Sequence, residues 1–296
     1  MLVQLWNVMA PVLIVIGLGF CWGRSRVPYA SEFVTRAVMN IGAPCLVVSA
    51  ISQADISGEG FAQVAIAASV VLAGTALLGA IVIRLMGGDL RALLSPIVFP
   101  NTGNMGLPLC LFAFGEEGLA LAVAFFMVQM TTLMTFGVAL MSRSGTGLWA
   151  TLRGLLQQPL IHAIAIALIM LASDVQLPVW IDSTLKLLGD FTIPLMLLTL
   201  GVSLSTLSTT GWWRSMGLSL LRIVGGLAFA WLAVTWMGMS GPARNVVLLQ
   251  AIMPAAVFNY LLALKYDREP AAVAGIVVAS TVMALVVVPL LLAILI

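Results

Sequence analysis

Electrical charge is what this 296-residue sequence has least of. Aspartate, glutamate, lysine and arginine together make up 8% of the residues, and the net charge at pH 7 is only +2. A soluble domain carries roughly 25% charged residues, so this chain has little surface suited to water. So small a net charge gives no reason to expect a nucleic-acid partner. Because 62% of the residues are hydrophobic, we expect nearly the whole chain to lie within a lipid bilayer.

Metal-binding and catalytic side chains are also scarce. The three cysteines, Cys21, Cys45 and Cys110, have no Cys-x-x-Cys spacing, and His162 is the only histidine. This pattern indicates neither a disulfide framework nor a metal site, and we expect no cofactor. An intramembrane aspartyl protease needs two facing aspartates, whereas only Asp190 lies well inside a hydrophobic segment. A serine protease needs a Ser/His pair, and no Gly-x-Ser-x-Gly motif is present. We therefore expect a protein that is not an enzyme.

Hydrophobic segments of roughly 20 residues fill the chain and are separated by short charged or Gly/Pro-rich breaks. They cover residues 3–22, 33–52, 61–85, 92–114, 119–141, 155–172, 184–204, 215–237, 244–266 and 271–296. We expect the first to be a retained helix, because no basic region precedes it and no cleavage site follows it. The sequence thus predicts an all-α integral membrane protein with ten transmembrane helices.

Basic residues are concentrated on one side of these predicted helices. That side holds Arg24, Arg26, Arg84, Arg91, Arg143, Arg153, Arg214, Lys265 and Arg268, with Arg36 and Arg222 close by. The opposite side holds Asp55, Glu59, Glu116, Glu117, Asp174 and Asp182, and only Lys186 and Arg244 among the basic residues. Since basic loops stay in the cytoplasm, we expect both termini outside, in a multi-pass protein of the inner (plasma) membrane.

The two halves of the sequence resemble each other. Pro44 in the second predicted helix and Pro194 in the seventh are 150 positions apart, and Asn40 matches Asp190 at the same offset. Two units of five helices each are inserted with opposite orientations, because five is odd. We expect inverted repeats at residues 1–141 and 142–296, an arrangement typical of secondary transporters.

The fourth and ninth predicted helices contain residues that interrupt helices. Proline removes a backbone donor, glycine weakens a helix, and freed backbone groups are tolerated at membrane depth only inside protein or beside a watery cavity. The fourth helix contains Pro96, Pro100, Gly103, Gly106 and Pro108, and the ninth contains Pro254. We expect two broken helices that cross near the midplane, the fourth broken near residues 101–103. The alternative is that each proline merely kinks its helix.

A crossing of this kind suits an anion. The second half of each broken helix directs its N-terminus, with unpaired N–H groups and a positive dipole, toward the crossing. Asn101 and Asn104 add amide donors without the cost of burying a cation. Candidate substrate-binding residues are therefore Asn101, Thr102, Asn104, Gln129, Gln250, Pro254 and Asn259. Hydrogen bonds between helices explain the polar residues Gln129 and Gln250 equally well.

Asp190 is a carboxylate one turn before Pro194 in the seventh predicted helix. Ionisable residues inside membrane helices are costly and are usually functional. Asp190 is therefore a candidate proton relay. The alternative is that it reaches water or pairs with Lys186.

These motifs resemble the auxin efflux carrier family, whose bacterial members include proteins assigned as malonate and malate permeases. Pro100-Asn101-Thr102 followed by Met105-Gly106-Leu107-Pro108-Leu109 is similar to the fourth-helix motif of that family, and Gln250-Ala251 with Pro254 to its ninth-helix motif. The resemblance implies a fold like that of bile-acid sodium symporters. Helices one, two, six and seven would form a scaffold, often dimeric, and helices three to five and eight to ten a moving transport domain. Asn101 and Gln129 match positions that help to hold the substrate carboxylate in plant members.

The expected function is therefore a carrier of small organic anions such as malonate, malate or auxin-like acids, working by an elevator mechanism. The expected partners are a carboxylate substrate, the lipid bilayer and a second copy of the chain bound through the scaffold helices. A sodium- or proton-coupled carrier of similar fold with another substrate is the alternative. Sodium sites commonly include a carboxylate, and the expected crossing has none, so the coupling stays open.

Overall fold

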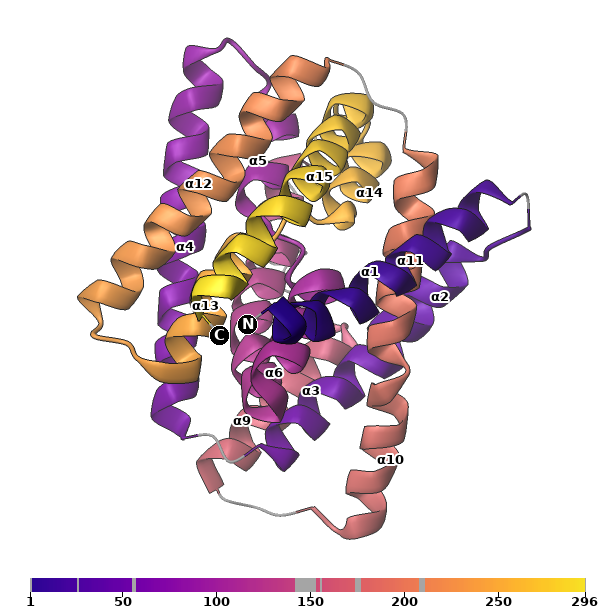
Figure 1. Cartoon of the computed structure of the whole chain (residues 1–296), viewed down its shortest axis with the longest axis vertical. Coiled ribbons are helices and arrows are strands. Elements are labelled where there is room, and N and C mark those ends of the chain that lie inside the picture. The colour runs from indigo at the N-terminus through magenta and orange to yellow at the C-terminus, as the bar shows by residue number, and fades with distance from the viewer. Residues whose placement is uncertain are drawn as a thin grey trace.

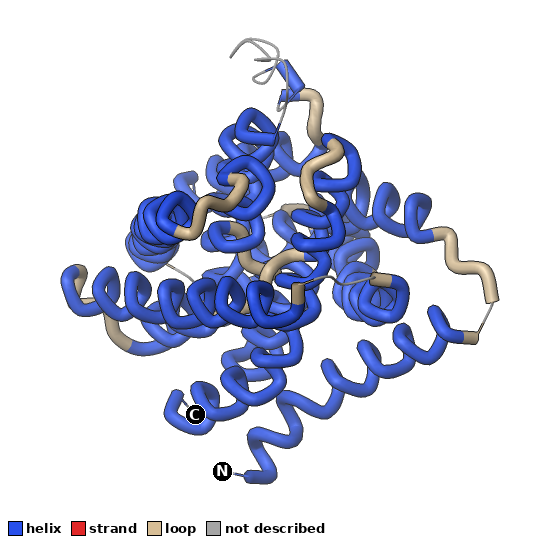
Figure 2. The backbone as a smooth tube through the Cα atoms, turned by 90° about the horizontal axis from the view of Figure 1, so that it is seen from above, coloured by secondary structure: helices blue, strands red, loops and turns tan. Residues whose placement is uncertain are grey.

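The computed structural model of the chain describes residues 2–25, 27–54, 57–141, 153–154, 156–173, 177–207 and 211–295. Over these residues the backbone is helical apart from short connections and one isolated pair of bridging residues (Figure 2). Four residues used in the orientation argument lie outside the described residues: Arg26, Asp55, Arg143 and Asp174.

Most helices are long and apolar. The first half contains α1 (Leu2–Arg24), α2 (Ser31–Ala37), the π-helical turn η1 (Val38–Gly42), α3 (Ala43–Gln53), α4 (Gly58–Leu85), α5 (Leu90–Val98), the π-helical turn η2 (Thr102–Gly106), α6 (Leu107–Thr132), the π-helical turn η3 (Leu133–Gly137) and α7 (Val138–Met141). The second half contains α9 (Pro159–Ser173), α10 (Val179–Asp190), α11 (Thr192–Thr206), α12 (Trp212–Trp236), α13 (Gly241–Ala251), α14 (Val257–Tyr266) and α15 (Pro270–Leu295). Among the described residues, seven helical stretches are long and apolar enough to cross a membrane, and α9 is a shorter apolar helix. The chain is a multi-pass membrane protein.

The stretch from η2 to α7 reverses direction at Gly115. The backbone there has φ 69° and ψ −161°, a conformation open only to glycine. A hydrogen bond supports this reversal: Thr102 Oγ1 donates to Gln129 Oε1, which is 27 residues further along the chain. In a straight helix these residues would lie about 40 Å apart. The chain must therefore double back between them, as the predicted segments 92–114 and 119–141 require.

The helices pack in two groups (Figure 1). In one group α1 packs along α11, and α3 packs against α9 and α10. In the other, α12 packs against α4 and α15, and α13 packs against α4 and α6. The assignment of helices one, two, six and seven to a scaffold and of the other helices to a transport domain stays a prediction. The division into inverted repeats at 1–141 and 142–296 stays a prediction.

Two glycines bring α1 and α11 together. A Cβ atom on Gly19 would lie 2.1 Å from the carbonyl oxygen of Leu198, and one on Gly201 would lie 2.1 Å from that of Ile16. Small residues of this kind let membrane helices approach closely and gain van der Waals contact. We therefore attribute the α1–α11 contact to these positions.

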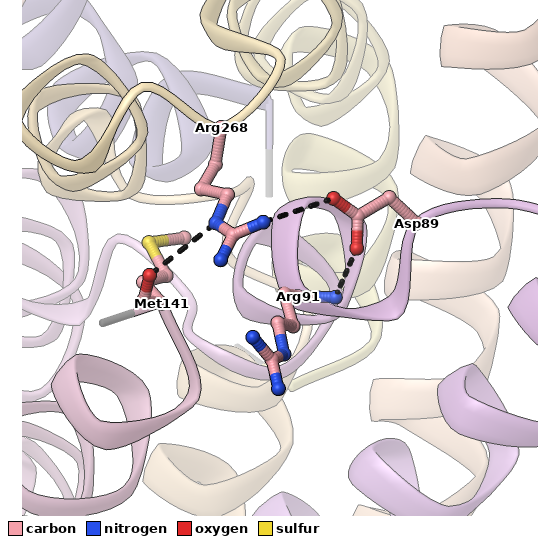
Figure 3. A network of polar contacts seen from close by, with 4 residues as sticks. All are labelled: Asp89, Arg91, Met141 and Arg268. Carbon is pink, nitrogen blue, oxygen red and sulfur yellow. Dashed lines mark hydrogen bonds and ion pairs between the residues drawn. The ribbon is translucent and has the colours of Figure 1, made fainter. Parts of the chain in front are cut away.

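Polar contacts join several loops at one end of the α4–α12 group (Figure 3). The Arg268 guanidinium lies 3.9 Å from Asp89 Oδ2 and donates to the backbone carbonyl of Met141 at 3.4 Å. Asp89 Oδ1 in turn accepts from the backbone N–H of Arg91, which caps the start of α5. The connections after α4 and α14 are thus tied to each other and to the end of α7.

Candidate functional site

The two predicted helix breaks lie side by side. Between α5 and η2 the chain is extended, and Pro100 pairs with Ala255 in an isolated antiparallel bridge. The Asn101 N–H donates to Pro254 O at 2.7 Å, and the Ala256 N–H donates to Phe99 O at 3.1 Å. Backbone N–H and C=O groups that lose their helical partners in one break are thus hydrogen-bonded by the other break. This pairing allows non-helical backbone inside a membrane protein.

The break in the first of these segments is shorter than the sequence predicts. It ends at Asn101, and Gly103 lies inside the π-helical turn η2. Pro108 lies in the first turn of α6, directly after that wider turn. Both residues lie in continuous helical backbone after the break. The expectation that Gly103 and Pro108 break the helix is therefore wrong, whereas Pro100 and Pro254 do lie in the breaks.

A cavity of about 120 Å³ adjoins the paired breaks. One water needs roughly 10–15 Å³ by this measure, so there is room for several waters or a small solute. Asn101, Asn104 and Gln129 line it from the α4–α12 group, and Met39 and Thr199 line it from the α1–α11 group. The cavity therefore lies between the two groups of helices.

Two lining residues, Asn101 and Gln129, carry amide donors. Asn101 is 4% exposed, and its Nδ2 atom has no hydrogen-bond partner among the described residues. Gln129 Oε1 accepts from the buried Thr102 hydroxyl, which turns Gln129 Nε2 away from that contact. Thr102 itself does not line the cavity and acts by orienting Gln129.

Asn259 does not line the cavity, and the expectation that it binds substrate stays a prediction. Its Oδ1 accepts from Ser95 Oγ at 2.7 Å, and its Nδ2 donates to Phe99 O and Ala256 O, each at 3.0 Å. The side chain is fully buried. Its amide is used to hold the two breaks together, which leaves no donor for a solute.

Gln250 and Pro254 are also separate from the cavity lining. Gln250 is fully buried, and its amide packs so closely on η2 that a Cβ atom on Gly106 would lie 2.0 Å from Oε1. Pro254 contributes its carbonyl to Asn101. Gln250 Oε1 and Nε2 have no hydrogen-bond partner among the described residues. Neither residue lines the cavity, and the expectation that they contact a solute stays a prediction.

Arg222 is a polar residue that the sequence analysis did not name as a site candidate. It lies inside α12, within the predicted segment 215–237, and is 0% exposed. Its guanidinium donates to Ile97 O at 3.1 Å and to Ala251 O at 2.8 Å, next to the two breaks. The signal that identifies it is an arginine within an apolar helix, because ionisable residues there are usually functional.

Residues 5–292 match the membrane transport protein family. The chain belongs to this family. A protein of Methanocaldococcus jannaschii described as an uncharacterized transporter is 28% identical over 220 residues, which cover 72% of this chain and 71% of that protein. The resemblance to the auxin efflux carriers is thereby confirmed at the level of the family, and the chain is a membrane transporter.

For a transporter of this family, the position of Asp190 bears on coupling. Asp190 lies at the exposed end of α10 and is not part of the cavity lining. Lys186, its suggested partner, donates instead to Gln53 Oε1 at 3.0 Å. The structure therefore separates this carboxylate from the cavity.

Proposed function

We propose that the chain carries small organic anions and binds them in the cavity beside the paired breaks. The observation that carries the proposal is that Asn101 lines the cavity and that its buried Nδ2 donor has no partner among the described residues. A buried donor without a partner costs about 1–3 kcal/mol, so the position favours a ligand that accepts a hydrogen bond. A carboxylate oxygen is such an acceptor.

Two helix N-termini add positive potential to the same cavity. Gly103 and Asn104 come from the start of η2, which continues into α6, and Val257 and Phe258 come from the start of α14. The first N–H groups of a helix have no partner within the helix, and each N-terminus carries about half a positive charge. The free N–H groups and the positive helix ends both favour an anion next to the starts of η2 and α14.

Apolar side chains complete the lining and suit the body of a small organic acid. They include Phe126, Met130, Leu133 and Met196. Methionines adapt to ligands of different shape. Malonate, malate and auxin-like acids share a carboxylate with a small or flat body, and they form the proposed substrate class.

The proposed architecture is ten transmembrane helices in two inverted repeats. The proposed mechanism is an elevator motion, in which one group of helices slides against the other. The cavity lies between the α1–α11 group and the α4–α12 group, so sliding one against the other would carry the solute. The loop contacts of Asp89 and Arg268 favour movement of the α4–α12 group as one body. The α1–α11 group is the proposed scaffold and dimer contact.

The direction of opening follows from a second, adjoining cavity. It shares Ser31, Ser203 and Leu261 with the first cavity and extends to Val27 and Tyr29 in the connection after α1. That connection belongs to the basic side, which we propose to be cytoplasmic in the inner membrane, with both termini outside. The described conformation is then open toward the cytoplasm.

Binding measurements on the purified protein test this proposal. Acetate, malonate, malate and indole-3-acetate are titrated while heat release or thermal stabilisation is recorded. Removal of one donor from a buried carboxylate costs about 1.5–3 kcal/mol, so Asn101→Ala should weaken the binding of an acid that the wild type binds by roughly ten- to a hundredfold. Asn7→Ala, an exposed asparagine on α1, is the matched control. Equal affinity in Asn101→Ala and wild type contradicts the proposed site.

A further inference from the structure

Arg222 connects the ends of two helices that stop at the breaks. The last carbonyl groups of a helix have no partner within it, and each C-terminus carries about half a negative charge. Arg222 Nη1 donates to a carbonyl in the last turn of α5, that of Ile97, and Nη2 donates to the last residue of α13, Ala251. One guanidinium therefore serves both negative helix ends.

Paired carbonyl ends of this kind form cation sites in transporters with broken helices, where they coordinate a coupling sodium ion. Here the guanidinium occupies that position. We propose that Arg222 is a built-in cation that replaces a coupling ion, so that the transporter binds its anion without sodium. This inference rests on the proposed anion site but makes a separate claim about coupling.

The charges around the breaks support this role. The C-termini of α5 and α13 contribute about −1 in total, and the N-termini of η2–α6 and α14 contribute about +1. Without Arg222 these contributions cancel, and with it the region carries about one positive charge. One bound anion would neutralise that charge. No sodium ion would then be needed to balance the charge of the anion.

The position is shaped to receive a guanidinium. Gly226, one turn after Arg222, faces the end of α13, and a Cβ atom there would lie 2.2 Å from Ala251 O and 3.4 Å from Arg222 Nη1. A side chain at position 226 would therefore push α12 away from the carbonyl that Arg222 contacts. The ion pairs found among the described residues do not include Arg222, so carbonyl groups and helix ends are what balance its charge.

Arg222 is a positioning residue in this account, because it does not line the cavity. Its charge acts on the anion through the backbone of the breaks. Burial of a charge in this way is costly unless hydrogen bonds compensate it. A purely structural role would make the same hydrogen bonds but would not affect the cation requirement, and this difference is what an experiment can measure.

The test uses purified protein and the panel of acetate, malonate, malate and indole-3-acetate, titrated in sodium chloride and in choline chloride. We expect the wild type to bind an acid of the panel with the same affinity in both salts. Binding of no acid in either salt would contradict the proposed function. Binding that requires sodium would contradict only the role of Arg222.

Three variants separate charge from structure. Arg222→Ala removes the cation and leaves space, and we expect at least a tenfold loss of affinity that sodium or added guanidinium partly restores. The guanidinium concentration is about 10 mM, far below the molar range that unfolds proteins. Arg222→Met, the matched control, fills the space without charge and should lose affinity without rescue. Arg222→Lys keeps the charge and should bind without sodium.

Two results overturn the inference. One is wild-type affinity in Arg222→Met, since no cation is then needed. The other is a folded Arg222→Ala that loses binding and regains none with either cation, since the role is then structural. If both uncharged variants fail to fold, the comparison of wild type and Arg222→Lys in the two salts decides, and a sodium requirement in either contradicts the proposal.

Discussion

Replacement of Asn259 by alanine should destabilise the protein without removing a substrate contact. The amide of Asn259 bonds Ser95 Oγ, Phe99 O and Ala256 O, and all of these contacts are buried. After the substitution Phe99 O still accepts from Ala256 N, and Ala256 O still accepts from the backbone N–H of residue 259. Only Ser95 Oγ loses its acceptor, so the cost divides between one hydroxyl left without a partner and two carbonyls that each lose a second bond.

The magnitude follows from these bonds. A buried hydroxyl without a partner costs about 1–3 kcal/mol, and each remaining bond contributes about 0.5–1.5 kcal/mol. Because both carbonyls keep a partner, each of these two bonds counts at its lower value of about 0.5 kcal/mol, and we expect about 2–4 kcal/mol in total. At about 2–4 °C for each kcal/mol, the melting temperature should fall by roughly 5–15 °C.

Thermal unfolding of the detergent-solubilised variant measures the shift, and titration at low temperature measures the affinity of the folded fraction. A double-mutant cycle with Ser95→Ala should show coupling, because the two side chains share one hydrogen bond. An unchanged melting temperature combined with loss of binding as large as in Asn101→Ala would refute this reasoning. Asn259 would then contact the solute, as the sequence suggested.

Three further predictions concern the fold and coupling. Gly115→Ala should lower the stability of the protein by about 1–3 kcal/mol, because the backbone conformation at this position is open only to glycine. Gly58→Ala is the control, because a Cβ atom there meets no atom within 4 Å, and thermal unfolding compares the two variants. Asp190→Asn should keep the wild-type pH profile of uptake, because Asp190 lies outside the cavity, and a lost pH dependence would restore the proton-relay hypothesis. Alkaline phosphatase fused after residue 296 should be active in a bacterial inner membrane, and an inactive phosphatase with a fluorescent reporter at the same place would reverse the proposed orientation.

The sequence predicts the two breaks because Pro100 and Pro254 remove backbone donors at those points. Pro96 in α5 and Pro289 in α15 lie inside helices, so a proline alone does not decide where a helix is interrupted. The reversal at Gly115 follows similarly from a glycine between two hydrophobic segments. What the sequence does not determine is the direction of side chains next to a break.

Asn101 and Asn259 illustrate that limit. Both are asparagines beside a proline break, yet Asn101 borders the cavity and Asn259 turns toward Ser95 and Phe99. The difference depends on how the two extended segments pair, which involves residues about 150 positions apart. Arg222 was not recognised as a site candidate for a related reason, because the sequence does not show that its guanidinium meets the ends of α5 and α13.

The central claim is that the anion occupies the cavity beside Asn101, and protection of an introduced cysteine tests it most directly. Asn104→Cys, on a background lacking Cys21, Cys45 and Cys110, places a thiol in the lining, and Asn7→Cys places one on the exposed face of α1. The rate of maleimide labelling is measured with and without a saturating acid of the panel. We predict that the acid slows labelling of Asn104→Cys and leaves Asn7→Cys unchanged. Equal labelling rates at Asn104→Cys, in protein that still binds the acid, would place the substrate elsewhere.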